Sequence, residues 1–441
     1  MIRSTPTARP SLPLRSPDRE ARPWREGSSL AHGRAGEPPL RVAIVGHLKF
    51  PIARPFLGGL ERFTHALVRG LQRRGVHVTL FASGDSDRSL GLEPLCPRST
   101  VAEGHDRFDE CDRGTGGPCD QWIDQYEDRL YADLMQRLSG GDLAGWFDVV
   151  HNNSINPVPI DFADQLTAPC TTTLHVPVLP RLEEQIECGG PRGDFINISG
   201  RNREQWSRLL PEQSLIPNAV DTTAWVPRPL WRRARAVWFG RILPDKGTHF
   251  AIEAAHKAGL PIDIAGPVSD PEYFREEVQP RLSAARGDRY LGACDTDELQ
   301  RLVARASVCL VTPCWEEPFG LVTAEAMSCG TPVAAFRRGG PAEIVSEASG
   351  RLCTPDDSEA LADAVRQCLT LDRRGVRDDA VARYDFELMI DRYLAHYRSL
   401  AEADRRVPRE AARVASSGSP TSGGPGVPVV AGGLEKQTTL A

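Results

Sequence analysis

The sequence lacks an apolar run long enough to cross a membrane, and it has no excess of positive charge. No stretch approaches the ~18–20 consecutive apolar residues that a membrane-spanning helix needs. Acidic residues outnumber basic ones by 59 to 53, which gives a formal net charge of −6. A nucleic-acid-binding protein usually presents a surplus of Lys and Arg to phosphate. We therefore expect neither an integral membrane protein nor a nucleic-acid-binding protein.

The 11 cysteines include no CxxC pair, and their number is odd. Cysteines in reducing compartments are seldom bridged, so the sequence predicts mainly buried free thiols. A polar, glycine-rich stretch contains Cys96, Cys111 and Cys119. For these three cysteines, a disulfide or a metal site is an alternative to free thiols. The N-terminus shows no charged-then-apolar signal pattern. Together these features predict a cytoplasmic protein.

Lysine is scarce, with 4 residues against 49 arginines, so the position of each lysine is informative. The length of 441 residues exceeds the ~250–300 at which a single core stops growing, which predicts two domains. Residues 1–40, with seven Pro and seven Arg, and residues 407–441, rich in Ser, Gly and Pro towards their end, are predicted to be disordered tails.

Between the tails, short apolar strands alternate with amphipathic helices. The expected strands are Arg41–Val45, Val76–Ala82, Val149–His151, Cys170–Leu174, Val237–Gly240, Ile262–Ala265, Val308–Thr312 and Pro332–Phe336. The expected helices are Leu60–Arg74, Tyr126–Leu138, His249–Ala258, Thr296–Ala306, Leu321–Ser328, Ser358–Leu369 and Phe386–Glu402. Near-continuous apolar strands separated by helices are typical of parallel sheets covered on both faces.

A proline-rich stretch near Pro217–Trp231 interrupts this pattern. The fold class expected is α/β, with two doubly wound, Rossmann-like domains over 41–218 and 232–385 that face each other across a cleft. A final helix over 386–406 crosses back onto the first domain. In such folds ligands bind outside the carboxyl ends of the strands, so the cleft is the expected active site.

The strongest chemical motif is Glu317-Pro318-Phe319-Gly320-Leu321-Val322-Thr323-Ala324-Glu325, which follows an expected strand and enters a helix. Pro318 suits a first helical turn, where its missing N–H costs nothing. Phe319, Gly320 and Leu321 would present unpaired amides at a positive helix end, which favours an anion. Carboxylates at Glu317 and Glu325 can accept hydrogen bonds from the paired hydroxyls of a sugar or a ribose.

Three further segments carry candidate chemistry. Arg241 and Lys246 lie in the turn after the first strand of the second half, and their charges can hold a diphosphate. Gly58 and Gly59 precede a helix, where their amides can approach a ligand closely. His175 follows an apolar strand, so it is expected at the cleft, where it can bond sugar hydroxyls or orient the acceptor.

These segments resemble the retaining GT-B glycosyltransferases of family 4. The resemblance covers most of 41–400 and extends to Thr331-Pro332-Val333 and Gly339-Gly340-Pro341-Ala342-Glu343-Ile344-Val345. It implies that Glu317 contacts the donor sugar and Glu325 the ribose. It also implies that Arg241 and Lys246 bind the pyrophosphate, while the amides of Phe319–Leu321 and the Gly58–Gly59 loop approach sugar and phosphate.

Two acidic triplets spell the D-x-D pattern that holds a metal in another glycosyltransferase fold, Asp85-Ser86-Asp87 and Asp295-Thr296-Asp297. Three-letter matches arise by chance in a chain with 59 acidic residues, so no metal site and no cofactor is predicted. Membrane docking through Arg69, Arg73 and Arg74 is a further possibility. It is not favoured, because residues 41–215 carry 18 basic against 24 acidic residues.

The sequence therefore predicts an enzyme of the EC 2.4 class that moves a sugar from a nucleoside-diphosphate donor to an acceptor hydroxyl without a metal. The resemblance implies that the anomeric configuration is retained. The residues expected to act in catalysis are His175, Glu317, Arg241 and Lys246. A nucleotide-sugar epimerase of the same fold and a non-catalytic sugar-nucleotide-binding relative stay open as alternatives. The sugar, the base and the acceptor are not specified.

Overall fold

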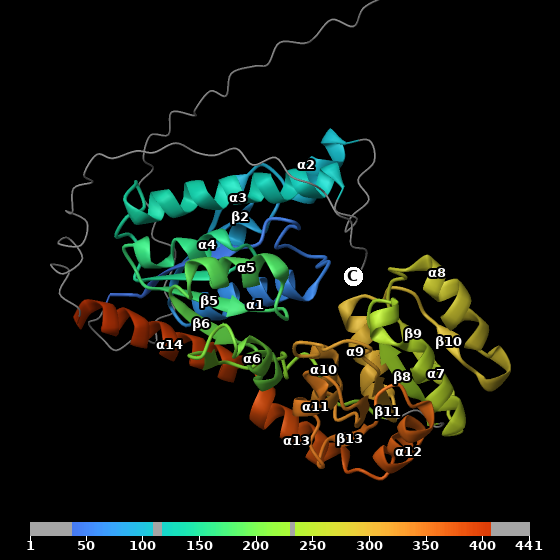
Figure 1. Cartoon of the computed structure of the whole chain (residues 1–441). Helices are drawn as coiled ribbons and strands as arrows, with labels where there is room; N and C mark the ends of the chain where they lie inside the picture. Colours follow the sequence, from blue (N-terminus) through green and yellow to red (C-terminus); the bar gives the residue numbers. More distant parts are fainter. Residues whose placement is uncertain (1–37, 109–116, 230–233, 407–441) are drawn as a thin grey trace, which may run out of the picture.

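The computed structural model describes residues 38–108, 117–229 and 234–406. Apart from residues 38–40, the two tails expected to be disordered, 1–40 and 407–441, lie outside the described residues. The chain forms two parallel sheets, each in a lobe of its own (Figure 1). The α/β fold class predicted from the sequence, with two doubly wound sheets, is confirmed.

The first sheet has seven strands in the order β3-β2-β1-β4-β5-β6-β7. Its strands are β1 (Arg41–Gly46), β2 (His77–Ser83), β3 (Leu92–Cys96), β4 (Val149–Asn153), β5 (Cys170–Leu174), β6 (Asp194–Asn197) and β7 (Ser214–Leu215). Its helices are α1 (Gly59–Arg73), α2 (Thr100–Arg107), α3 (Pro118–Ser139), α4 (Val158–Asp161), α5 (Pro180–Gly189) and α6 (Gly200–Trp206). Alternate residues of β1 enter two different cores, one on each face of the sheet, as a fully covered parallel sheet requires.

The second sheet has six strands in the order β10-β9-β8-β11-β12-β13. They are β8 (Ala236–Phe239), β9 (Ile262–Ala265), β10 (Arg289–Tyr290), β11 (Val308–Val311), β12 (Val333–Phe336) and β13 (Gly350–Cys353). The helices that follow are α7 (Thr248–Lys257), α8 (Pro271–Tyr273), α9 (Thr296–Arg305), α10 (Leu321–Ser328), α11 (Pro341–Ile344), α12 (Ser358–Cys368), α13 (Arg373–Tyr384) and α14 (Phe386–Arg406).

Two stretches of backbone cross between the lobes, and they are bonded to each other. The Val220 amide donates to the Tyr384 carbonyl at 2.9 Å, and the Phe386 amide donates to the Val220 carbonyl at 3.0 Å. Arg377 of α13 adds hydrogen bonds to the carbonyls of Thr222 and Trp225, both at 3.0 Å. The connection between the lobes is therefore a paired crossing and not a single strand of chain.

Helix α14 packs on the first lobe although it follows the second in sequence (Figure 1). Its residues Ile390, Tyr393 and Tyr397 share a core with β1 and α1. Near its start, Glu387 and Asp391 pair with Arg73 and Arg74 at the end of α1. Two of the three arginines considered for membrane docking therefore contact α14.

A buried polar chain fixes α14 to the centre of the first sheet. The fully buried ring of His151 on β4 bonds the Thr173 hydroxyl of β5 through Nε2 and the Tyr397 hydroxyl through Nδ1, both at 2.7 Å. Burial, with smaller contributions from His175 and His396, holds the pKa of His151 well below its usual value. His151 is therefore a neutral core residue that joins sheet and helix.

Tyr397→Phe is expected to destabilise this junction, because it leaves His151 Nδ1 buried without a partner. A buried polar atom that loses its partner costs about 1–3 kcal/mol. Urea unfolding followed by tryptophan fluorescence measures the loss. The control is Tyr393→Phe, whose hydroxyl has a longer contact of 3.3 Å with Thr173. Equal losses in the two variants would contradict the assignment.

The cysteines depart in part from the expected pattern of buried free thiols. Nine of the cysteines in the described residues are free, but Cys188 is exposed and Cys294, Cys314 and Cys353 are only partly buried. Cys119 is disulfide-bonded, so the alternative left open for its stretch of sequence applies there. In the described part of the chain, no helix has the length and apolar character needed to cross a membrane.

Candidate functional site

The loop between β11 and α10 carries the first candidate carboxylate. The Glu317 carboxylate accepts hydrogen bonds from the indole N–H of Trp315 at 2.9 Å and from the Lys246 ammonium. The same ammonium lies 5.2 Å from the centre of the Trp315 ring, a cation–π distance. All three side chains are only partly buried, so a ligand can reach this group of residues.

Helix α10 begins directly after this loop and offers amides to an anion. Its N-cap is Gly320, with φ of +87°, and no side chain of a described residue caps the helix end. A left-handed conformation of this kind favours glycine. The Phe319 ring is buried against Tyr384, with ring centres 5.7 Å apart. Phe319 therefore contributes its ring to the core and only its backbone to the site.

The loop is held against the segment that follows β12. The Gly340 amide donates to the Glu317 carbonyl at 2.6 Å, and the Gly339 amide donates to the Glu316 carboxylate at 3.0 Å. A Cβ atom on Gly340 would lie 2.1 Å from the Phe319 carbonyl oxygen. Glycine is required here because the two backbones touch, and this contact sets the position of Glu317.

The basic turn follows β8 and carries the two cations predicted from sequence. Its end is tied to β11, since the Thr312 hydroxyl donates to the Lys246 carbonyl at 2.9 Å and the Cys314 amide donates to the Asp245 carbonyl at 2.7 Å. Arg241 is exposed and forms no hydrogen bond or ion pair with any described residue. The structure thus joins Lys246 to Glu317 and leaves Arg241 free in solvent.

The second candidate carboxylate, Glu325, lies within α10 and is almost fully buried, with 2% of its surface exposed. Its carboxylate is paired with the guanidinium of Arg62, which comes from α1 of the other lobe. The predicted ribose-binding residue therefore contacts the opposite lobe. Neither the spacing nor the composition of the sequence indicates this pair.

The glycine loop before α1 is supported by a buried hydrogen bond between a carboxylate and an imidazole. The Glu61 carboxylate bonds His47 Nε2 at 3.0 Å, and both side chains are buried. Burial raises the pKa of Glu61. The hydrogen bond and the electrostatic interaction with His47, together with the backbone amides of Glu61 and Gly58, lower that pKa by a larger amount, so its net shift is downward. Glu61 therefore stays ionised and fixes Gly58 at the start of the helix.

His175 lies at the carboxyl end of β5, as predicted, and is joined to α1 through a chain of side chains. Its Nε2 bonds the Asn153 amide oxygen at the end of β4, and the Asn153 amide donates to the Thr64 hydroxyl on α1. The His175 ring also packs on Phe63, with ring centres 4.7 Å apart. Its hydrogen bonds and ring contacts stay within the described first lobe.

The protonation state of His175 limits its chemistry. Burial, with a smaller effect from His47, lowers the pKa of His175 to about 3. The imidazole is therefore neutral at physiological pH. Because Nε2 faces a carbonyl oxygen it carries the proton, which leaves Nδ1 as a hydrogen-bond acceptor. His175 can orient a hydroxyl group but does not supply a proton as an acid.

The lobes also meet at α6. The Ser199 hydroxyl, at the N-cap of this helix, bonds the Pro318 carbonyl, and the Arg201 amide donates to Glu343 at 3.0 Å. A cavity of about 280 Å³ opens beside this contact and is lined by Arg201, Glu204, Gln205 and Glu316. Residues from both lobes line this cavity, and one of them, Glu316, directly precedes Glu317 in the sequence.

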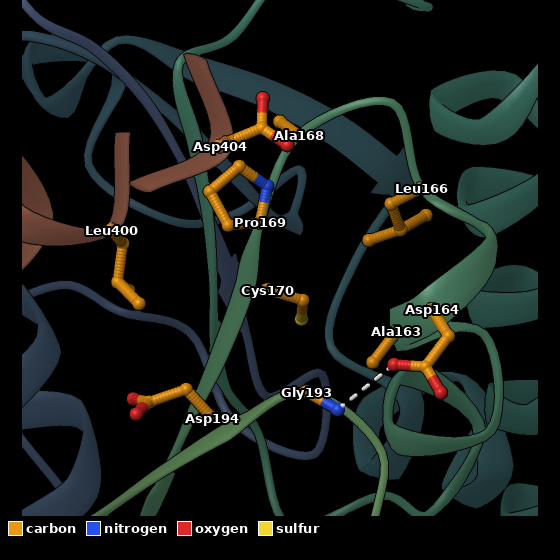
Figure 2. Close-up of a pocket in the computed structure, with 10 residues that line it drawn as sticks. All are labelled: Ala163, Asp164, Leu166, Ala168, Pro169, Cys170, Gly193, Asp194, Leu400 and Asp404. Carbon is orange, nitrogen blue, oxygen red and sulfur yellow. Dashed lines mark hydrogen bonds between the residues drawn. The ribbon is translucent and has the colours of Figure 1, made fainter. Parts of the chain in front are cut away.

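A second cavity, of about 330 Å³, lies in the first lobe at the amino ends of β5 and β6. Figure 2 shows it around Cys170 and Asp194, the first residues of β5 and β6, with Leu400 and Asp404 of α14 on one side. Ligands of doubly wound folds bind at the carboxyl ends of the strands. This cavity is at the amino ends and contains none of the predicted site residues.

Both D-x-D triplets make structural contacts within the chain. Asp85 accepts a hydrogen bond from the Ser99 amide at 3.0 Å, and Asp87 accepts one from the Ser89 amide at 2.9 Å. Asp295 forms a capping box with Glu298 at the start of α9. Across 38–108, 117–229 and 234–406, no three His, Cys, Asp or Glu residues are grouped as metal ligands would be.

Trp315 was not singled out from the sequence, although it lies two residues before Glu317. We expect Trp315→Phe, which keeps an aromatic ring for Lys246 but removes the N–H donor to Glu317, to lower kcat/KM about 10-fold. Hydrogen bonds to charged groups are worth about 1.5–3 kcal/mol. Steady-state kinetics measure the loss, with Trp146→Phe, which changes an exposed tryptophan of the first lobe, as the control. Unchanged kinetics would show that the indole N–H does not position Glu317.

Two family models match the chain. Residues 57–224 match the model described as Glycosyltransferase Family 4, and residues 232–381 match the model described as Glycosyl transferases group 1. The two matched ranges correspond closely to the two lobes and together include every predicted site residue.

Curated proteins with assigned activities are similar over most of their length. Glycogen synthase of Mycobacterium tuberculosis (strain ATCC 25618 / H37Rv) is 26% identical over 373 residues, which cover 75% of this chain and 86% of that protein. D-inositol 3-phosphate glycosyltransferase of Mycolicibacterium smegmatis is 26% identical over 426 residues, which cover 86% and 95%.

Among solved structures, AviGT4, a glycosyltransferase involved in Avilamycin A biosynthesis, superposes with a TM-score of 0.58 at 22% identity, covering 82% of this chain and 98% of that one. Anabaena HepE in complex with UDP and glucose gives 0.62 at 19% identity, covering 82% and 100%. At these identities the likeness shows the fold.

Proposed function

The chain belongs to the group 1 and family 4 glycosyltransferases, a retaining family that uses nucleotide-sugar donors, and we propose that it transfers a sugar from a nucleoside-diphosphate sugar to an acceptor hydroxyl without a metal. The observation that carries this proposal is the contact of Lys246 with Glu317 at the uncapped start of α10. A cation, a carboxylate and free amides stand together there. These are the groups that a diphosphate joined to a sugar needs.

In this proposal each half of the donor has its own residues. Arg241, Lys246 and the amides of Phe319–Leu321 bind the diphosphate, while Glu317 and Glu325 accept hydrogen bonds from the sugar and the ribose. Gly58 and Gly59 approach the diphosphate from the other lobe. Residues 232–385 then form the donor domain, and residues 41–218 form the acceptor domain.

The proposed reaction is a substitution at the sugar C1 in which the acceptor attacks from the same face that the diphosphate leaves. The bond between the sugar C1 and the diphosphate oxygen breaks, the acceptor oxygen bonds C1 on the same face, and the acceptor proton passes to the departing diphosphate. Negative charge grows on the diphosphate as it leaves, and preorganised donors lower this barrier. His175 and Glu317 orient the acceptor and the sugar, as expected of a neutral imidazole and a fixed carboxylate.

Metal independence follows from the same distribution of charge. Two cationic side chains and a helix end are available to the leaving group, so no divalent ion is needed to neutralise it. The acidic triplets that spell D-x-D have other partners, a backbone amide for Asp85 and a capping box for Asp295.

Thermal-shift titration of the full chain with UDP, GDP, ADP and TDP, with magnesium or with EDTA, tests the proposal. A ligand at ~100 times its dissociation constant stabilises the folded state by about 2.7 kcal/mol. We expect one nucleotide to raise the melting temperature equally in both buffers. The absence of a shift with all four would contradict donor binding, and a shift only with magnesium would contradict metal independence.

The epimerase alternative and the binding-protein alternative are separated by product analysis. A glycosyltransferase releases nucleoside diphosphate from the donor and increases that release when an acceptor is present. An epimerase returns an isomeric sugar, and a non-catalytic relative returns the donor unchanged. Chromatography of donor incubations distinguishes the three.

A further inference from the structure

One ion pair joins the two lobes at the site assigned to the donor. Arg62 on α1 contacts Glu325 on α10, and the two side chains differ greatly in exposure: 40% of the Arg62 side chain is accessible against 3% of that of Glu325. Glu325 is thus a buried carboxylate whose cationic partner reaches it from solvent.

Arg62 is also close in sequence to the loop proposed to face the diphosphate. It lies in the first turn of α1, three residues after Gly59, and Gly58 is the N-cap of that helix. The next residue towards the N-terminus, Glu61, is locked to His47 beneath the loop. Arg62 is therefore a partly exposed cation at the start of a helix, close in sequence to the amides proposed to approach the phosphates.

In the proposed function, Glu325 accepts hydrogen bonds from the ribose hydroxyls. Arg62 occupies Oε1 of this carboxylate, so a ribose hydroxyl that bonds the same oxygen competes with the guanidinium and favours separation of the pair. The released guanidinium then stands beside a ligand with two phosphate groups. Guanidinium binds carboxylate and phosphate with the same planar pair of N–H donors.

We propose that Arg62 is a donor-binding residue that exchanges partners, pairing with Glu325 in the empty enzyme and with the donor diphosphate in the loaded one. The inference rests on the proposed function and adds a diphosphate ligand from the acceptor lobe. Each charged group has a partner in both states. Glu325 and Arg62 pair with each other in the empty enzyme, whereas in the loaded enzyme Glu325 accepts hydrogen bonds from the ribose hydroxyls and Arg62 binds phosphate. It also couples donor binding to the approach of the two lobes.

A simple latch between the lobes is the competing explanation. In that case Arg62 would hold the lobes together through Glu325 and make no contact with the donor. The two explanations differ in one quantity, the factor by which a nucleoside gains affinity when it acquires its diphosphate. Only partner exchange makes that factor depend on Arg62.

The test measures this factor with matched ligand pairs: UDP with uridine, ADP with adenosine, GDP with guanosine and TDP with thymidine. Dissociation constants of the full chain are measured by ligand-observed NMR titration in wild type, Arg62→Ala and Arg62→Lys. The control is Arg69→Ala, which removes a second arginine from α1 with nearly the same exposure, 41%, whose partner Asp87 is in its own lobe.

For the pair that wild type binds, we expect Arg62→Ala to reduce the ratio of nucleoside to diphosphate dissociation constants about 10-fold to 100-fold, the value of a lost hydrogen bond to a charged group. Arg62→Lys should retain part of the ratio, since lysine keeps the positive charge but lacks the planar pair of N–H donors of a guanidinium. Arg69→Ala should leave the ratio unchanged.

A ratio that is unchanged in Arg62→Ala overturns partner exchange, whether or not the melting temperature of the variant falls. A fall of the same size in Arg69→Ala also overturns it, because general loss of positive charge on α1 would then explain the result. Failure of wild type to bind any of the four diphosphates would instead contradict the proposed function itself.

Discussion

Lys246→Ala is expected to lower kcat at least ~100-fold. The ammonium is one of the groups proposed to neutralise the diphosphate as it leaves, and removing one preorganised electrostatic donor typically costs a factor of 10²–10³ in kcat. The substitution also removes the cation that contacts the Glu317 carboxylate. Loss of this pair alters the donor-sugar site in addition to the leaving-group site.

The measurement is kcat and KM for donor turnover, with the melting temperature of each variant as a check on folding. Lys257→Ala is the matched control, since Lys257 is one of the four lysines and its ammonium contacts Ser358 and Glu359 at the start of α12. It should turn over at the wild-type rate. A near-normal kcat for Lys246→Ala would contradict its proposed role at the diphosphate.

Glu317→Ala is expected to lower kcat by a similar factor, at least ~100-fold. The carboxylate is proposed to hold the reacting sugar, and correct placement of a reacting group is worth several kcal/mol of the barrier. The fold should survive, because Glu317 is only partly buried and its backbone contacts with Gly340 do not depend on the side chain.

Glu317→Gln separates charge from shape, because the amide oxygen can still accept the Trp315 N–H while the charge that pairs with Lys246 is lost. It should fall between wild type and Glu317→Ala. Glu359→Ala, which removes an exposed carboxylate at the start of α12, is the control. Wild-type kcat in Glu317→Ala would show that this carboxylate does not hold the sugar.

Much of the fold could be predicted from periodicity alone. The continuous apolar strands Val149–His151 and Val308–Thr312 could belong only to covered parallel sheets, and both are central strands in the structure. The least predictable elements are the short edge strands such as β10, whose two residues are exposed and carry no apolar pattern. Helix α3 begins eight residues before its predicted start, and its added first turns bury Cys119 and Ile123.

The predicted site residues are clear in sequence where one segment contains the whole feature. The loop between β11 and α10 contains Glu317, Phe319 and Gly320, and Glu325 follows in α10 itself. The motif therefore covers one continuous segment, and the local geometry of these residues follows from it. Arg62 is different, because its partner is 263 residues away and in the other lobe. No local pattern encodes the meeting of two helices across a cleft.

Trp315 shows a second kind of limit. A tryptophan beside a glutamate usually indicates packing, and only the coordinates show that its N–H points to the carboxylate while its ring faces an ammonium. Gly340 shows a third limit. The need for glycine comes from contact with Phe319, a residue that is close in space and belongs to a different loop.

The central claim is metal-independent, retaining transfer from a nucleoside-diphosphate sugar. The most direct measurement is NMR detection of sugar released from the donor whose nucleotide stabilises the chain, in EDTA and with water as the acceptor. The account predicts nucleoside-diphosphate release in EDTA, with a first-formed anomer that has the configuration of the donor and a rate that falls in Lys246→Ala. Release that requires magnesium, or a first-formed anomer of opposite configuration, would contradict it.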